Sequence, residues 1–211
     1  MGIFDWFRRP PPIEDRPALT DFLDTRAAFL SQKSVFDYAR GISGPFFSQL
    51  IKEAAFVEGV DKARWTTYPV SISLVAEMAY GVLMPVRNQP VQLAAVLTEC
   101  SLEAFDRYPV PAPVGSEYWT EARRELTARV EAVSLHPPKY VKDIPLPVAQ
   151  RYLDAMPIHE RLRGKDYELV RNQLRGTLLT MHRDFVKRAN LERLVEELDL
   201  ELAAERTAAA G

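Results

Sequence analysis

The sequence is poor in the residues that most often carry covalent or metal chemistry. It contains one cysteine, Cys100, and three histidines among 211 residues. A single cysteine excludes an intramolecular disulfide and a zinc cluster built from several thiolates, and it fits a reducing compartment. His136, His159 and His182 are too far apart to form the close helical pair typical of a metal site. We therefore expect no metal and no cofactor, and we place the chain in the cytoplasm.

Long hydrophobic runs and an excess of one charge are also missing. The longest apolar stretch, 70–86, is interrupted by Ser71, Ser73 and Glu77, and it is shorter than the roughly 20 residues that span a bilayer. Twenty-seven Lys and Arg against 29 Asp and Glu leave a formal net charge of −2. A protein that coats nucleic acid needs a strong positive field. The sequence therefore predicts a buried helix at 70–86 and no nucleic-acid binding.

The composition is typical of one globular domain, with 47% hydrophobic and 27% charged residues. The periodicity predicts an all-α fold, an irregular multi-helix bundle of about seven to eight helices. We expect a head and Pro-rich linker over 1–18, a single helical domain over 19–206, and a fraying tail over 207–211. The Pro-rich segment 108–115 is a candidate hinge within that domain.

Prolines mark the expected helix boundaries, because proline is accepted at a helix start but breaks a helix interior. The predicted helices are 21–40, capped by Thr20, then 45–65, 69–84, a helix after Asn88, 116–135, 147–155, a long one from the cap Asp166 to 188, and 190–206. The alternation of 70–74 would also suit a strand, but the helical run after it favours a helix.

Phenylalanines at seven-residue spacing mark the first of these helices. Phe22, Phe29 and Phe36 should form one stripe. We expect the stripe to be buried in the core or against a second copy of the chain. A second helix is expected to begin at Pro45 and to carry Phe46, Leu50, Ala54 and Val57.

The first nine residues form an aromatic head that precedes three prolines. An aromatic segment with a basic end suits a groove on a partner protein or weak peripheral contact at the inner face of the membrane. Packing onto its own domain is the alternative. No apolar run follows the arginines, so an export signal is not predicted. The contact residues would be Ile3, Phe4, Trp6, Phe7, Arg8 and Arg9.

The last predicted helix, 190–206, is acidic and amphipathic. Its apolar face contains Leu191, Leu194, Leu198 and Leu202. This face either packs back onto its own domain or joins a partner helix, including that of a second copy in a homo-oligomer.

Two carboxylates and one histidine are candidate pocket residues. Glu77 and Glu99 are each the lone ionisable group of an apolar stretch, and His182 lies near an apolar helix face. If both glutamates faced inward, the pKa of their carboxyls would rise and they could act as acid and base or hold a cation. The alternative is that the two glutamates point to solvent, because unpaired buried carboxylates are costly.

Two other motifs were considered as sites. Arg171, Asn172 and Arg175 follow the predicted start of the long helix at 166 and could bind an anion, although the acidic residues around them could equally balance a solvated face. The segment 41–45 fails the spacing of a hydrolase nucleophile elbow, so we expect Ser43 to cap the helix that begins at Pro45.

The segments 22–38 and 156–175 resemble parts of uncharacterised alphaproteobacterial helical proteins of about this length. The resemblance implies no established activity. We therefore expect a non-catalytic protein-interaction or assembly (adaptor) factor that uses the head and the acidic helix. The alternative is a small-molecule-binding protein or an enzyme, such as a hydrolase, with a pocket between helices.

Overall fold

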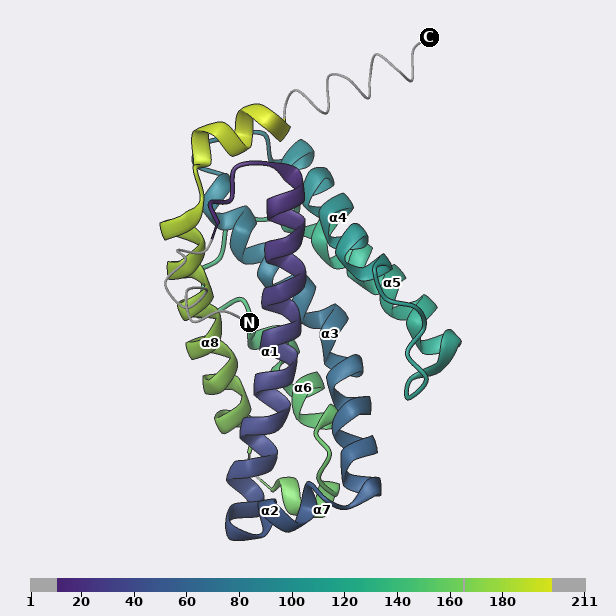
Figure 1. Cartoon of the computed structure of the whole chain (residues 1–211). Coiled ribbons are helices and arrows are strands. Elements are labelled where there is room, and N and C mark those ends of the chain that lie inside the picture. Colours follow the sequence, from purple (N-terminus) through teal and green to yellow (C-terminus); the bar gives the residue numbers. More distant parts are fainter. Residues whose placement is uncertain (1–10, 165, 199–211) are drawn as a thin grey trace, which may run out of the picture.

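The computed structural model describes residues 11–164 and 166–198, which form an all-α bundle without strands (Figure 1). This confirms the predicted fold class. Residues 191–198 are also helical. The elements are α1 (Arg16–Ser43), η2 (Gly44–Phe46), α2 (Phe47–Leu50), α3 (Ala54–Leu83), α4 (Pro90–Asp106), α5 (Gly115–Glu131), η3 (Ala132–Leu135), η4 (Leu146–Val148), α6 (Ala149–Ala155), α7 (Glu160–Arg163) and α8 (Tyr167–Arg188).

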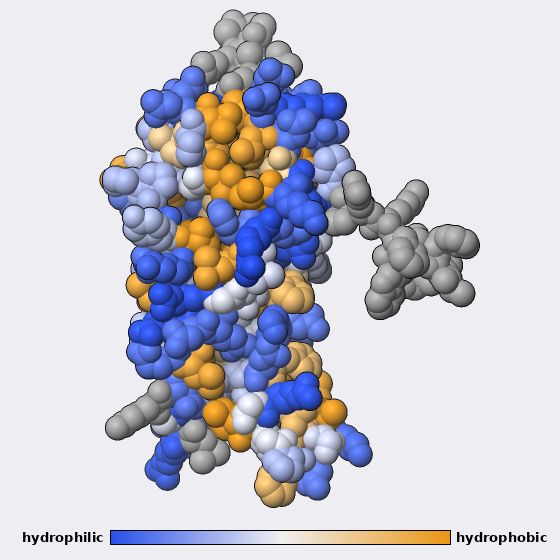
Figure 2. Space-filling model, turned by 90° about the vertical axis from the view of Figure 1, so that its left-hand side faces the viewer, coloured by the Kyte–Doolittle hydropathy of each residue, from blue (hydrophilic) through white to orange (hydrophobic). Residues whose placement is uncertain are grey.

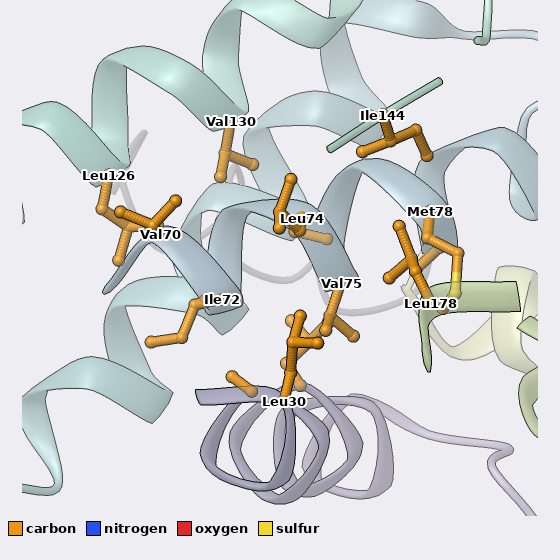
Figure 3. Close-up of a cluster of buried hydrophobic side chains, with 14 of the residues drawn as sticks. Leu30, Val70, Ile72, Leu74, Val75, Met78, Leu126, Val130, Ile144 and Leu178 are labelled. Carbon is orange, nitrogen blue, oxygen red and sulfur yellow. The ribbon is translucent and has the colours of Figure 1, made fainter. Parts of the chain in front are cut away.

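The middle of the bundle is α3, which contacts α1, α4, α5, α6 and α8. Every residue from 67 to 80 is buried, as expected for a helix that is surrounded by others. The alternating segment 70–74 belongs to this helix, so the strand alternative is excluded. Side chains from four helices meet in the core shown in Figure 3, among them Leu30, Leu74, Val75, Val130 and Leu178.

Pro69 lies inside α3, so the helix break predicted at this proline is wrong. Proline removes one helical hydrogen bond and crowds the preceding turn, at a cost of about 3 kcal/mol. Neighbouring helices supply donors to carbonyls in that turn. Ser31 Oγ on α1 donates to the Arg64 carbonyl at 2.6 Å, and Tyr118 OH on α5 donates to the Thr66 carbonyl at 2.7 Å. These contacts join the carbonyls on either side of Trp65, whose own carbonyl loses its helical donor to the proline, to α1 and α5.

The first helix begins earlier and ends later than the sequence predicts. Asp15, and not Thr20, caps α1 by accepting a hydrogen bond from the Ala18 amide at 2.8 Å. Thr20 is buried one turn inside the helix. The end expected at Gly41 is passed, and the chain leaves the helix at Gly44, whose φ is +51°. The linker boundary expected at residue 18 therefore falls within α1.

The phenylalanine stripe of α1 is only partly in the core. Phe22 is 2% exposed, whereas Phe29 is 50% and Phe36 is 40% exposed. Leu23 and Leu30, which follow Phe22 and Phe29 in sequence, are fully buried, so this side of α1 faces the core. The stripe is therefore not buried as a whole within its own chain, and its burial against a second copy stays a prediction.

The two ends of the described chain meet. Ile13 is fully buried, its amide donates to the Arg188 carbonyl at 3.1 Å, and its carbonyl accepts from the Asn190 amide at 3.0 Å. In the helix that follows, Leu194 and Leu198 are fully buried within the same chain. The apolar face of 191–198 therefore packs back, and these two leucines, predicted as partner contacts, are core residues.

Three further contact predictions concern the ends of the chain. Leu191 is partly buried and packs against the core cluster. The head, 1–9, and Leu202 lie outside the described residues.

Candidate functional site

The residues predicted to form a pocket lie apart, and the two glutamates among them contact different partners. Glu77 is buried on α3 and accepts a hydrogen bond from Lys139 Nζ at 2.7 Å. The half-exposed Glu99 on α4 pairs with Arg16 at 3.1 Å. His182 is partly buried on α8. The expectation that both glutamates face solvent is thus wrong for Glu77, which is buried with a cationic partner. The described contacts do not join these three residues into an acid–base site.

The candidate anion site is neutralised by its neighbours. Arg171 forms an ion pair with Glu168 one turn earlier in α8. Arg175 Nε donates to the carbonyl of Lys142 at 2.8 Å. Asn172 Oδ1 accepts from Arg171 at 3.4 Å. This arrangement matches the solvated, internally paired face that was the alternative in the sequence.

Two expected caps are not formed. The side chain of Ser43 makes no capping bond to η2. Asp166 makes none to α8 either and instead accepts a hydrogen bond from Tyr38 OH at 2.8 Å.

The described residues contain neither a metal-binding cluster nor a membrane-spanning helix. Within 11–164 and 166–198, no three His, Cys, Asp or Glu side chains lie close enough to hold a metal ion. None of the helices in that part of the chain has the length and hydropathy needed to cross a bilayer.

A buried carboxylate, Asp24 on α1, organises a polar cluster between α1, α3 and the segment after α4. It accepts hydrogen bonds from Tyr68 OH at 2.8 Å and Tyr108 OH at 3.0 Å, and it pairs with Arg107 at 3.3 Å. Burial, and then the nearby Asp24 charge, raise the pKa of both tyrosines. Both hydroxyls therefore keep their protons and donate. The cluster ties the start of the predicted hinge, at Tyr108, to the core.

The most unusual surface is an apolar tip, which we define as residues 41–58 between α1 and the start of α3. It contains seven large apolar side chains, and none of them is buried. The most exposed, Phe46, has 66% of its surface accessible. The tip forms the lower end of the bundle in Figure 1, around the label α2. The seven residues are Ile42, Phe46, Phe47, Leu50, Ile51, Phe56 and Val57.

Local sequence explains why the apolar tip projects. Gly44 turns the chain out of α1 through a positive φ, and Pro45 begins a short 3-10 helix. The next helix, α2, is one turn long and has no buried residue. Phe47 and Phe56 pack edge to face with ring centroids 6.3 Å apart. The apolar residues from Phe46 to Val57 are therefore left on the surface, because no element among the described residues covers them.

Charges around the apolar tip cancel. The charged residues between 40 and 58 are Arg40, Lys52, Glu53 and Glu58, two of each sign. All four are exposed. The tip thus combines an apolar surface with a neutral rim, which gives no electrostatic preference for an anionic lipid surface.

A separate feature is a concave surface between α1 and α8, which we call the α1–α8 groove. Its volume is about 560 Å³. The ion pair between Arg26 and Asp184 closes one end at 2.6 Å. At the other end, Gln173 Nε2 donates to the Lys33 carbonyl at 3.4 Å. Figure 2 views the molecule from the side that carries α8, where apolar patches lie among hydrophilic side chains. The lining residues are Arg26, Phe29, Lys33, Asn172, Gln173, Gly176, Thr177, Thr180, Met181 and Asp184.

Sequence reasoning missed both surfaces. The signal for the apolar tip was present in the dense apolar residues around Gly44 and Pro45, but these residues were assigned to a helix without asking what would cover them. The α1–α8 groove could not be read from sequence, since it depends on which faces of two distant helices meet. Comparison of the chain with protein-family models, with curated proteins and with solved structures finds no match.

Proposed function

We propose that this chain is a non-catalytic protein-interaction or assembly factor that binds a partner protein through the apolar tip. The observation that carries the proposal is an apolar segment in which none of seven large apolar side chains is buried, on a bundle whose other helices bury a continuous core. Contiguous apolar surface of this kind is typical of interaction sites. Phe46, Ile51 and Val57 are 66%, 44% and 49% exposed, so burying their remaining surface in a partner would contribute about 2 to 5 kcal/mol before the costs of association.

The charge around the tip favours a protein groove over a membrane as its partner. Lipid recognition by a short apolar segment is strengthened by neighbouring Lys and Arg. At the tip, Arg40 and Lys52 are offset by Glu53 and Glu58. An apolar cleft on a protein requires no net charge on the side that enters it. We place this interaction in the cytoplasm.

Photocrosslinking in living cells of the native host tests the proposal. A photoreactive phenylalanine analogue would replace Phe46 in one full-length variant and Leu135 in another. Leu135 is the matched control, because it is 84% exposed and lies outside the tip. We expect an adduct of defined mass from position 46 and none from position 135. An adduct of twice the chain mass would identify a second copy as the partner.

A second substitution separates binding from folding. Ile51→Ser should abolish the adduct at position 46 while changing the unfolding free energy by less than about 0.5 kcal/mol, as for other surface substitutions. Equal crosslinking at both positions, or an adduct that survives Ile51→Ser, would show that the tip is not the interaction surface.

A further inference from the structure

We infer that the aromatic head, residues 1–9, docks into the α1–α8 groove of the same chain. This contact is independent of the apolar tip and lies on another part of the bundle. In this arrangement the head of the same chain fills the groove, which is therefore not an open ligand pocket.

The start of the described chain is fixed beside the groove. The carbonyl of Pro11 accepts a hydrogen bond from Arg188 Nε at 3.0 Å, and Ile13 pairs with the backbone at 188–190. Arg188 lies one helical turn beyond Asp184, and its guanidinium pairs with that carboxylate at 3.2 Å. The head is therefore tethered at the end of the groove that the Arg26–Asp184 pair closes.

The length of the head matches the length of the groove. From Asp184 to Asn172 the groove runs along twelve residues of α8, or about 18 Å at 1.5 Å per residue. An extended chain covers roughly 3.3 Å per residue, so Trp6 can reach about 17 Å from Pro11. This distance brings the aromatic residues of the head over the middle of the groove.

The lining of the groove suits aromatic side chains. Phe29 forms a half-exposed wall, and Met181 is buried in the floor. At Gly176 an added Cβ would meet nothing within 4 Å, so the middle of the groove is open space. A volume of about 560 Å³ lies in the usual range for sites that hold apolar ligands. Because the head is tethered, even modest contacts suffice, since the effective concentration of a short linked segment is on the order of millimolar.

Fluorine NMR of the full-length chain labelled with fluorotryptophan tests the docking. The chain has three tryptophans, of which Trp65 and Trp119 lie in the fold and Trp6 lies in the head. Trp6→Phe assigns the Trp6 resonance by its loss. Gly176→Leu fills the open groove. Gly41→Leu is the matched control, because Gly41 is also a helical glycine with open space at its Cβ but lies outside the groove.

Docking predicts a Trp6 resonance displaced from that of a synthetic peptide of residues 1–12. It should return to the peptide position in Gly176→Leu and stay displaced in Gly41→Leu. The resonances of Trp65 and Trp119 report that each variant is folded. A wild-type Trp6 resonance at the peptide position, or one insensitive to Gly176→Leu, would overturn the inference. A displacement that disappears on tenfold dilution would also overturn it, since the contact would then join two copies.

Discussion

Asp24→Ala removes the acceptor at the centre of the polar cluster between α1, α3 and the segment after α4. In the native fold this carboxylate accepts hydrogen bonds from Tyr68 and Tyr108 and pairs with Arg107. Its side chain is only 10% exposed. The substitution leaves two tyrosine hydroxyls without their charged acceptor in a site from which water is largely excluded.

The expected loss of unfolding free energy depends on which other acceptor each tyrosine hydroxyl can reach once Asp24 is gone. Hydrogen bonds to a charged group contribute about 1.5 to 3 kcal/mol each, and an orphaned buried donor costs about 1 to 3 kcal/mol. Tyr68 is buried but can shift fully to the Ala104 carbonyl, which it already approaches at 3.3 Å. Tyr108 is partly exposed and can turn to water. We therefore expect Asp24→Ala to lower the unfolding free energy by about 3 kcal/mol.

A double-mutant cycle with Tyr68→Phe isolates the interaction. Urea unfolding at neutral pH, followed by circular dichroism, gives the free energy of each variant. Tyr68→Phe alone should cost about 1.5 to 3 kcal/mol, because it removes a bond to a charged acceptor. In the Asp24→Ala background it should cost only about 0.5 to 1.5 kcal/mol, because the hydroxyl then donates only to the neutral Ala104 carbonyl. The coupling should thus be about 1 to 1.5 kcal/mol.

The control for this cycle is Asp37→Ala, which removes an exposed carboxylate paired with Lys33 on the same helix. Exposed pairs of this kind contribute less than about 1 kcal/mol. If Tyr68→Phe costs the same with and without Asp24, the carboxylate does not organise the cluster. The same conclusion follows if Asp24→Ala is no more costly than Asp37→Ala.

Two further outcomes test the account of burial and of backbone conformation. Burial raises the pKa of Tyr152, and it raises that of Cys100 to about 11. The unfolded chain releases these protons at lower pH than the folded protein does. The contribution of both groups to the unfolding free energy should therefore be fully present below about pH 8 and be lost as the pH rises toward 11. Equal urea midpoints at about pH 8 and about pH 11 would refute this. Gly44→Ala should lower stability by about 1 to 3 kcal/mol, since φ is +51° there although nothing crowds the Cβ. Gly41→Ala, in an open helical position, should instead raise stability by about 0.4 to 1 kcal/mol, so equal effects in thermal unfolding would contradict the backbone argument.

Local patterns predicted the helices of the second half of the chain well. The segments 116–135 and 147–155 agree with the structure to within a residue when the 3-10 helices η3 and η4 are counted with α5 and α6, and the long helix ends at 188 as expected. In these segments hydrophobic period, turn residues and prolines all indicate the same boundaries. At Pro69 the local rule failed, since the proline lies inside α3, a helix that packs against α1, α4, α5, α6 and α8.

Burial was the harder quantity to predict. The Phe46 and Leu194 stripes look alike in sequence, yet the first is exposed at the apolar tip and the second includes a fully buried leucine. Likewise Glu77 and Glu99 both interrupt apolar stretches, but Lys139 from a distant loop pairs with the buried one. Whether an apolar or charged side chain is covered depends on elements far away in the sequence.

The sequence by itself determined that this protein is helical and where most of its helices lie. It also showed that cysteine and histidine, the residues most used for disulfides and metal sites, are scarce. Hydrophobic period and helix propensity are local properties, so they can be read from neighbouring residues. The tertiary structure alone decided that Asp24 gathers two tyrosines, that the 191–198 helix returns to the core, and that the tip around Phe46 is left uncovered. Those features arise from contacts between residues tens of positions apart, whose free energies depend on three-dimensional packing.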